Sequence, residues 1–375
     1  MLNSFFNNFS YYKWWKNLDK SILTFIITFF LIGLFFSLVS TSLIASDKLD
    51  TNSYFFFFKH LLFVLFGLVI IFVISFLEKD FLYKISIYIF FTTLILLILV
   101  PIIGIEVKGS KRWIDLFFLP RIQPIEFVKP FFIIMLALII SNKSLSNLTT
   151  KFIFSLLLTL LISFLLIIQP DLGQTLLITF SWLMLIFVSG INLILLSSIT
   201  IFVLTSLLYA TFNVAKFEYI KNRLLSFFNS ENGTHNFQSD KAIDSITSGG
   251  FFGKGIGEGT LKNRVPEAHT DYIISVISEE FGVIAIILIL VLFLSFVYSI
   301  FKKVENENDE TARLILIGSS CLILLQSMIH IGVNIRLFPT TGMTLPFLSY
   351  GGSSIISISV FSGIILNLTK RKVQI

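Results

Sequence analysis

Ten apolar runs, each long enough to cross a lipid bilayer, constrain this 375-residue chain more than any other feature. A membrane-spanning helix needs about 20 mostly apolar residues, and it satisfies its own backbone where no water is available. The predicted fold is therefore an all-α integral membrane protein of about ten transmembrane helices with one long external loop. The runs lie at residues 22–45, 54–77, 82–103, 125–141, 152–168, 172–189, 191–211, 273–300, 312–334 and 348–368.

The composition agrees with a chain embedded in lipid. Charged residues make up 13% of the sequence, where soluble domains carry about 25%, and the mean hydropathy is +0.90. The net charge of +6 suits anionic lipid headgroups and anionic substrates. Lys and Arg are scattered between the apolar runs, so we expect no nucleic-acid binding. The single cysteine, Cys321, excludes an internal disulfide.

We expect a single membrane domain with one sizeable segment outside the bilayer. Within that segment, Phe212 to Phe228 has apolar residues at near-helical spacing between charges, which predicts an amphipathic helix on the membrane surface. No small-residue cleavage site follows the first 20 residues, so we expect the first span to be retained. The predicted segments are a cytoplasmic N-terminal interfacial segment (1–21), transmembrane helices one to seven (22–211), an extracytoplasmic loop (212–272), helices eight to ten (273–368) and a cytoplasmic tail (369–375).

Basic residues set the predicted orientation, because cytoplasmic loops carry an excess of Lys and Arg. Ten spans place both termini on one side, and a cytoplasmic position for both gives the short cytoplasmic loops most of these residues. The loop between the third and fourth spans opposes this trend. Its basic group predicts an anionic ligand on the outer side, and it consists of Lys108, Lys111, Arg112 and Arg121.

Ionisable residues at membrane depth are costly and are functional candidates by default. Those in or beside the spans are Glu126, Lys129, Asp171, Glu279, Glu280 and His330. Glu126 and Lys129 share one helical face, so they form either an internal ion pair or part of a site. Asp171 either caps the next helix or acts in a site. Of two adjacent glutamates at least one is expected to be structural, and His330 is expected to be a packing residue.

Glycines cluster at residues 249–259, between the long loop and the eighth span. Glycine permits unusual backbone angles and close approach to a ligand, so this segment is either a flexible re-entrant turn or part of a binding site. Its spacing superficially resembles a nucleotide-binding loop. The absence of a preceding strand and the external location argue against that interpretation.

Two further segments combine polar and small residues at predicted helix starts. Asp271 stands where the long loop enters the eighth span, so it either caps that helix or serves as a general base facing an outer cavity. Residues 346–354 open the tenth span. Their small side chains allow helices to pack closely, and they also leave backbone amides able to meet an anion.

Together these segments resemble the SEDS family, the RodA/FtsW/SpoVE cell-wall polymerases. The resemblance covers most of the chain from the third span onward, in four blocks that occur in the family's order. The blocks are residues 108–129 (KGSKRW, then QP-x-E and Lys129), 169–173 (QPDLG), 266–282 (PEAHTD, then EE-x-G) and 344–354. The family usually has serine at the position of Ile125, so no hydroxyl role is expected there. Residues 257–262 and 340–346 resemble the division branch, FtsW, more than the elongation branch, RodA.

The resemblance implies polymerisation of lipid II at the outer face of the bacterial inner membrane, with release of undecaprenyl pyrophosphate. It implies a class B penicillin-binding protein and divisome membrane proteins as partners, at the division septum. No cofactor is evident, although a divalent cation is compatible with the chemistry. The implied catalytic residue is Asp271, and the implied substrate-binding residues are Lys108, Lys111, Arg112, Trp113, Gln123, Glu126, Lys129, Asp171, His269, Thr270, Ser349, Gly351 and Gly352.

Two alternatives to a polymerase remain open from the sequence: a lipid II flippase and a scaffold that only recruits partners. A carrier would distribute its charged residues along a path to the cytoplasmic side. The distinctive polar blocks are instead all predicted at the outer face. A scaffold would not explain why a carboxylate and a basic cluster converge from distant loops. Both arguments favour chemistry at the outer face.

Overall fold

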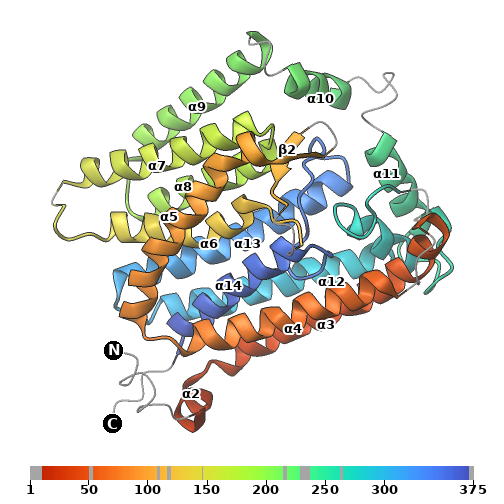
Figure 1. The fold of residues 1–375 in the computed structure, drawn as a ribbon, viewed down its shortest axis with the longest axis horizontal. Helices are drawn as coiled ribbons and strands as arrows, with labels where there is room; N and C mark the ends of the chain where they lie inside the picture. The colour runs from red at the N-terminus through yellow and green to blue at the C-terminus, as the bar shows by residue number, and fades with distance from the viewer. Residues whose placement is uncertain are drawn as a thin grey trace.

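The computed structural model is a bundle of long, roughly parallel helices (Figure 1). It describes residues 11–49, 54–107, 110–115, 120–145, 147–213, 218–228, 237–261 and 265–370. The helices are α2 (Tyr11–Asn17), α3 (Lys20–Leu49), α4 (Phe55–Phe76), α5 (Lys79–Ile103), α6 (Pro124–Ile140), α7 (Leu148–Ile168), α8 (Leu172–Val188), α9 (Leu193–Asn213), α10 (Glu218–Phe228), α11 (Phe237–Gly249), α12 (Ile273–Val304), α13 (Glu310–Asn334) and α14 (Gly352–Leu368). The strands are β1 (Ile105–Val107) and β2 (Ser110–Trp113), which form an antiparallel hairpin.

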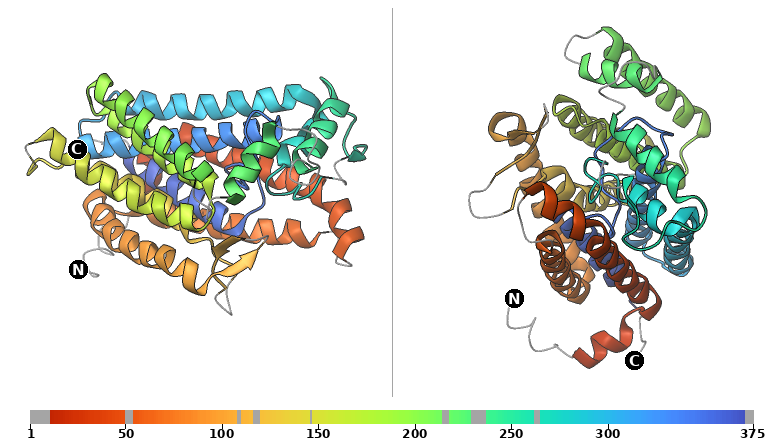
Figure 2. Two further views of the ribbon diagram at one scale, coloured as in Figure 1. Left: turned by 90° about the horizontal axis from the view of Figure 1, so that it is seen from above. Right: turned by 90° about the vertical axis from the view of Figure 1, so that its right-hand side faces the viewer.

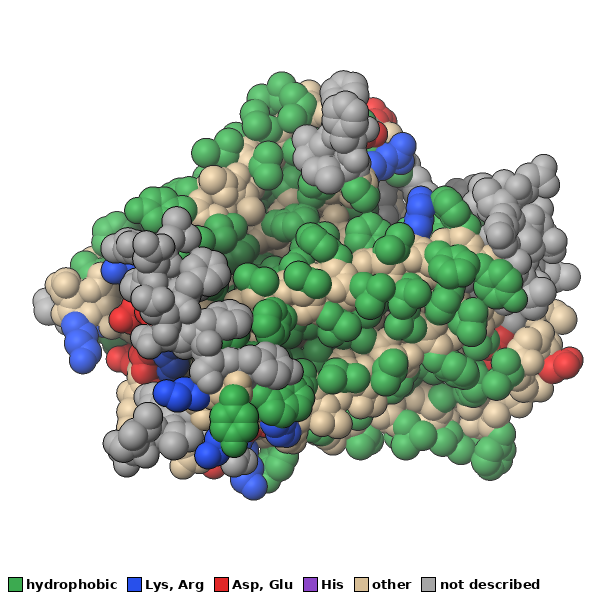
Figure 3. Space-filling model, turned by 60° about the horizontal axis from the view of Figure 1, so that its bottom comes forward, with side chains coloured by type: hydrophobic (Ala, Val, Ile, Leu, Met, Phe, Trp, Pro, Cys, Tyr) green, Lys and Arg blue, Asp and Glu red, His purple; other side chains and the backbone are tan. Residues whose placement is uncertain are grey.

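The prediction of a helical membrane protein with about ten spans is confirmed. Helices α3 to α9 and α12 to α14 coincide with the ten predicted apolar runs. Within the described residues, six of them are long and apolar enough to cross a membrane without further argument. Apolar side chains cover the middle of the face in Figure 3, and charged side chains gather toward its two ends. This is the distribution expected of a surface in contact with lipid.

Polar contacts show which helix ends meet on one side of the bundle. Lys303 at the end of α12 bonds Asp19 before α3 at 2.5 Å, and Lys79 at the start of α5 bonds Glu307 at 3.2 Å. Burial alone would raise the pKa of Asp19, but hydrogen bonds from Lys303 and a backbone amide hold that pKa below its ordinary value. We call this side the terminal end, because α3 begins and α14 finishes there, and we call the opposite side the distal end.

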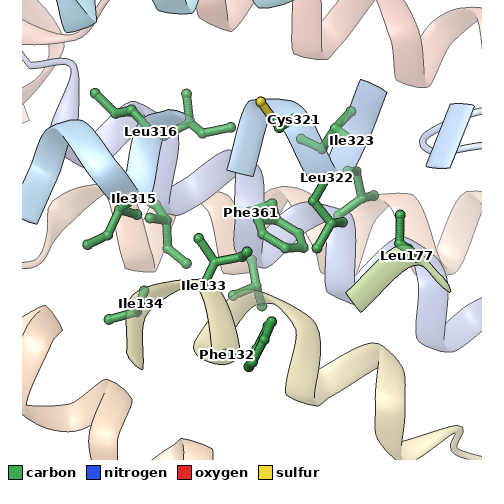
Figure 4. Packing of buried hydrophobic residues seen from close by; sticks show 14 of the residues in the cluster. Phe132, Ile133, Ile134, Leu177, Ile315, Leu316, Cys321, Leu322, Ile323 and Phe361 are labelled. Carbon is green, nitrogen blue, oxygen red and sulfur yellow. The ribbon is translucent and has the colours of Figure 1, made fainter. Parts of the chain in front are cut away.

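The interior is packed closely enough that several contacts tolerate only glycine. A Cβ on Gly363 of α14 would lie 2.8 Å from the Cβ of Ile74, so α4 and α14 pack backbone to backbone there. Around α6, α13 and α14, the buried cluster in Figure 4 includes Phe132, Leu322 and Phe361. Lipid is as apolar as these side chains, so van der Waals packing, rather than the hydrophobic effect, favours helix association.

The long segment between α9 and α12 contains more structure than predicted. The amphipathic helix expected within residues 212–228 is confirmed as α10, which is shorter than predicted. A second helix, α11, was not predicted. Arg336 of the turn after α13 bonds Asp240 at 2.7 Å and so fixes α11 against the bundle.

Candidate active site

A cavity of about 550 Å³ opens at the distal end of the bundle, which faces the viewer in the right-hand panel of Figure 2. Three stretches that are far apart in the sequence form most of its walls: the hairpin with the residues that follow it, the turn before α12, and the stretch from the end of α13 to the start of α14. Gln174 of α8 and Gln238 of α11 complete the lining. Its polar lining residues are Ser110, Arg112, Arg121, Gln123, Glu126, Gln174, Gln238, Glu267, Thr270, Asp271, Thr340, Thr341, Thr344, Tyr350, Ser353 and Ser354.

Asp271 lies on the cavity wall, in the turn immediately before α12. The helix-cap interpretation of Asp271 does not match the structure, because α12 begins at Ile273 and the residue at the cap position is Tyr272. The turn itself folds back on the carbonyl of Glu267, which accepts bonds from the amides of Thr270 and Asp271, both at 3.1 Å. Glu267 has a positive φ of 55°. The chain therefore reverses sharply just before it enters the helix.

Three hydrogen bonds fix the backbone on which Asp271 stands. The carbonyl of His269 accepts from the amide of Tyr350 at 3.1 Å, and the carbonyl of Thr270 accepts from the Ser349 hydroxyl at 2.7 Å. The carbonyl of Asp271 accepts from the side-chain amide of Asn334 at 3.0 Å. Three consecutive carbonyls are thus held by α13 and by the segment that leads into α14. This arrangement preorganises the carboxylate relative to the rest of the cavity.

Arg112 of β2 reaches across to the turn between α7 and α8. Its guanidinium donates hydrogen bonds to the carbonyls of Gln169, at 3.3 Å, and Pro170, and lies 3.8 Å from the carboxylate of Asp171. Asp171 also accepts from the amide of Gln174 at 3.4 Å, so the interpretation of Asp171 as a helix cap is confirmed. These contacts hold a cation at the cavity wall and leave it only partly exposed.

Asp271 and Arg112 come close together beside Gly342. A Cβ placed on Gly342 would lie 3.7 Å from the carboxylate of Asp271 and 3.8 Å from the guanidinium of Arg112. Both groups line the cavity, so a base and a cation flank the same space. Gly342 itself has a φ of +71°, which favours glycine. Arg121, an exposed side chain 3.8 Å from the carboxylate of Asp115, adds a second cation to the lining.

The ion-pair interpretation of Glu126 and Lys129 is confirmed. Lys129 is almost fully buried and donates to Glu126 at 2.8 Å and to Gln326 at 3.0 Å. Gln174 of α8 donates to the same Glu126 oxygen at 2.9 Å. Glu126 and Gln174 both line the cavity, so this network ties α6, α8 and α13 together beneath it. The mutual bonds at one Glu126 oxygen offset the cost of burying these charges; among the described residues, the other Glu126 oxygen is buried without a hydrogen-bond partner.

Two other buried ionisable residues have structural partners. Glu279 is fully buried and accepts from the Ser245 hydroxyl and from the amide of Leu261, both at 2.9 Å. It therefore holds α11 and the glycine-rich segment, as expected for at least one of the two adjacent glutamates. His330 is buried in α13 and bonds the carbonyl of Met343 at 2.8 Å, so the packing interpretation of this histidine is also confirmed.

The structure brings about half of the predicted site residues to the cavity. Those on its wall are Arg112, Trp113, Gln123, Glu126, Thr270, Asp271 and Gly351. Those elsewhere in the described chain are Lys111, Lys129, Asp171, His269, Ser349 and Gly352. The side chain of Lys111 is exposed on β2, Ser349 supports the Asp271 turn, and Gly352 packs on the ring of Phe63. Lys108 lies outside the described residues. Substrate binding by all of these residues, whether or not they line the cavity, stays a prediction.

Sequence reasoning missed several hydroxyl and amide groups of the lining. Thr344 and Ser354, whose hydroxyls lie 2.6 Å apart, belong to the block 344–354. That block was interpreted through the family resemblance and through the small side chains and backbone amides of residues 346–354, and neither hydroxyl was singled out. Gln174 follows a motif that was noticed, and a polar side chain one turn into an apolar span could have indicated it. The described residues contain no group of three His, Cys, Asp or Glu side chains placed to hold a metal. The divalent cation stays a prediction.

Comparison with known proteins places the chain among bacterial cell-cycle membrane proteins. The profile of the FtsW/RodA/SpoVE family, described as cell cycle protein, matches residues 19–374. The probable peptidoglycan glycosyltransferase FtsW of Caulobacter vibrioides is 30% identical over 96% of this chain and 91% of its own length. The protein of the same name from Trichlorobacter lovleyi is 33% identical over 94% of this chain and 93% of its own length.

Solved structures show the same fold. A chain from a peptidoglycan synthase complex that coordinates polymerization and crosslinking superposes with a TM-score of 0.77 at 25% identity, over 94% of this chain and 97% of that one. The rod shape determining protein RodA of Thermus thermophilus superposes with a TM-score of 0.70 at 24% identity, over 96% and 99%. Ten matching apolar helices, a polar cavity at one end and a profile that covers nearly the whole sequence agree: the chain belongs to the FtsW/RodA/SpoVE family of membrane proteins.

Proposed function

We propose that this protein is a peptidoglycan glycosyltransferase that polymerises lipid II into glycan strands at the outer face of the bacterial cytoplasmic membrane. Relatives that carry this activity in their names align over almost the whole chain. The observation that carries the proposal is the meeting of Asp271 and Arg112 on the wall of one cavity. A glycosyl transfer with a pyrophosphate leaving group needs a base and a cation close together.

The cavity suits a single displacement. The carboxylate of Asp271 takes the proton from the 4-hydroxyl of the incoming disaccharide as that oxygen bonds to the anomeric carbon of the growing strand. The bond from that carbon to the pyrophosphate breaks, and undecaprenyl pyrophosphate leaves with the electron pair. Asp271 later returns the proton to solvent. One carboxylate suffices, because pyrophosphate departs without protonation, whereas classical glycoside hydrolysis uses two carboxyl groups.

Arg112 is placed to stabilise the leaving group. Negative charge accumulates on the pyrophosphate as the bond breaks, and a cation already in position requires little reorganisation. Contacts to the α7–α8 turn hold the guanidinium of Arg112 before any ligand binds. Arg121 on the same wall is available for the second phosphate, and we retain Lys108 in this group from the sequence. Transport is not favoured, because the polar side chains of the cavity gather at the distal end.

The division role, the partners and the orientation complete the proposal. Similarity to proteins named FtsW supports a role in septal synthesis, and the likeness to a chain of a synthase complex supports a separate crosslinking partner, a class B penicillin-binding protein. The distal end faces outward and both termini face the cytoplasm. Two reporters can be fused after Lys370, one active only in the cytoplasm and one active only in the periplasm. Only the first should therefore give a signal. A periplasmic signal would contradict this orientation.

The test of the proposed function is glycan synthesis by purified Asp271→Asn protein supplied with labelled lipid II. Asparagine keeps the shape of the side chain but lacks the basic site, so the rate should fall by about 10²–10⁴-fold. Asp244→Asn is the matched control, since that carboxylate is exposed on α11 and contacts Lys241 at 3.1 Å. Turnover near the wild-type rate at equal folded protein would refute the base assignment. Loss of lipid II binding would point to substrate positioning instead.

A further inference from the structure

Helix α12 is broken near its start, and the glycine-rich segment fills the break. Gly282 has φ 77° and ψ 177°, which interrupts the helical hydrogen bonds. The carbonyls of residues 279 and 280 instead accept from the amides of Lys254, at 2.9 Å, and Gly255, at 3.0 Å. In return, the amide of Val283 donates to the carbonyl of Gly250 at 3.0 Å. These reciprocal bonds fix the turn at residues 250–256, which we call the glycine turn.

Two observations place the break in α12 at the edge of the membrane's hydrocarbon region. Beyond the break, α12 continues through residues 283–304, about 22 residues and about 33 Å, which matches the thickness of a hydrocarbon core. Phe281, just before the break, packs against Phe35 with ring centroids 5.8 Å apart. Phe35 lies within the apolar span Lys20–Val39 of α3. The glycine turn therefore lies at the distal boundary of the hydrocarbon.

The glycine turn presents its largest apolar side chains outward. Phe251 is 75% exposed and Phe252 is 83% exposed, and Ile256 of the same turn is 62% exposed. A turn held in place by backbone bonds at both ends presents these side chains in a defined position. Contiguous apolar exposure of this kind marks contact with another phase or molecule.

We propose that the glycine turn inserts Phe251, Phe252 and Ile256 into the outer leaflet of the membrane, at the level of the headgroups and the first acyl carbons. Aromatic side chains favour this interface. The exposed side of α12 begins next to the turn at Ile284 and continues through Ile287, so the three side chains extend a surface that already faces lipid. The amine of Lys254 lies 3.6 Å from the buried carboxylate of Glu279, so this ion pair also holds the turn against α12. The inference does not depend on the proposed enzymatic activity.

The inserted turn would hold the active-site region at a fixed depth. It follows α11 directly and precedes the segment that leads to Asp271. Because its backbone is bonded to α12, anchoring the aromatic side chains in lipid also anchors the broken end of α12. A lipid substrate that enters from the same leaflet would then meet the cavity at a constant height.

The test measures the immersion depth of a nitroxide at residue 252. Full-length protein carrying Cys321→Ser and Phe252→Cys is spin-labelled and reconstituted in nanodiscs of phosphatidylethanolamine and phosphatidylglycerol. Collision rates with oxygen, which partitions into lipid, and with a water-soluble nickel complex then report the depth. Ile287→Cys on exposed α12 is the lipid control, and Asp244→Cys on α11 is the water control.

The expected ratio of oxygen to nickel collisions at residue 252 is close to that at residue 287 and several-fold above that at residue 244. A ratio equal to the water control would overturn the proposal. Shielding from both reagents would also overturn it, because it would place the turn against a second copy of the chain or another protein. The label at Ile256→Cys repeats the measurement if the variant at residue 252 does not fold.

Discussion

Asn334, at the end of α13, offers a sharp test of how the structure positions Asp271. Its side-chain amide donates to the carbonyl of Asp271 at 3.0 Å and to the carbonyl of His330 at 2.9 Å. The residue is fully buried and is absent from the cavity lining, so it acts only through its neighbours. Its side-chain oxygen also accepts from the amide of Ser275 at 3.3 Å. Asn334→Ala removes all three hydrogen bonds and leaves the carbonyl of Asp271 without this anchor.

The expected effects on stability and on rate have different magnitudes. Three buried hydrogen bonds contribute about 0.5–1.5 kcal/mol each, so the free energy of unfolding should fall by about 1.5–4.5 kcal/mol. The rate responds to position, and a displacement of about 1 Å at a reacting group can cost about 10²-fold. We expect glycan synthesis per folded molecule to fall about 10- to 100-fold through kcat, with little change in KM.

Asn367 of α14 provides a matched control at the opposite end of the bundle. It is also buried, and its amide donates to the carbonyls of Ile74 at 2.8 Å, Ser75 at 3.5 Å and Leu77 at 2.7 Å. Asn367→Ala should therefore lower stability by a similar amount and leave kcat unchanged. The measurements are thermal unfolding in detergent and polymerisation of labelled lipid II. Equal loss of kcat in both variants would refute the positioning argument, because it would show that any loss of packing suffices.

Three further predictions concern the cavity and the break in α12. Arg112→Ala should reduce lipid II polymerisation at least tenfold more than Lys111→Ala. Arg can bind two phosphate oxygens at once, and of these two residues Arg112 alone lines the cavity. Equal losses of activity would contradict this. Gly342→Ala should lower kcat, since its methyl group would enter the space beside Asp271 at a φ that costs about 1 kcal/mol for alanine, and an unchanged kcat would place the substrate elsewhere. Gly282→Ala should fail to accumulate in membranes, because its Cβ would lie 2.0 Å from a backbone carbonyl of the glycine turn; wild-type levels in an immunoblot would disprove the tight contact.

The membrane-spanning part of the fold was predictable because lipid imposes one strong rule on sequence. Every span must be apolar for about 20 residues, and ten runs of this kind occur in the sequence. The turn at Gln169 to Asp171 divided two such runs, and the structure places the boundary between α7 and α8 there. Asp271 was a candidate because an ionisable residue at the start of a span is costly, and the family resemblance selected it over a helix-start role. Its position on the cavity wall came from the structure.

The structure outside the membrane-spanning helices was less predictable, because segments in water do not have to follow a single hydrophobic pattern. Helix α11 is short and mixes polar and apolar residues, so no long apolar run indicates it, and its position depends on the distant bond between Arg336 and Asp240. The hairpin of β1 and β2 is only a few residues long, and its pairing is a tertiary property. The break at Gly282 looks like ordinary helix in sequence, because the segment that replaces its hydrogen bonds lies about 30 residues earlier.

Backbone strain gathers where the cavity is assembled. Glu267, Arg336 and Phe347 have positive φ values of 55°, 57° and 65°, each at a cost of about 1–3 kcal/mol for a residue with a side chain. Glu267 and Arg336 lie at the distal end, in the Asp271 turn and in the turn after α13. Phe347 lies deeper in the bundle, in the segment before α14, where its ring stacks on Phe29 of α3 with centroids 5.0 Å apart. Irregular backbone at this depth is tolerated only where protein or a polar cavity satisfies it. The strain is therefore offset by the same hydrogen bonds that hold Asp271, and removing one of those bonds should loosen the turn and the active site together.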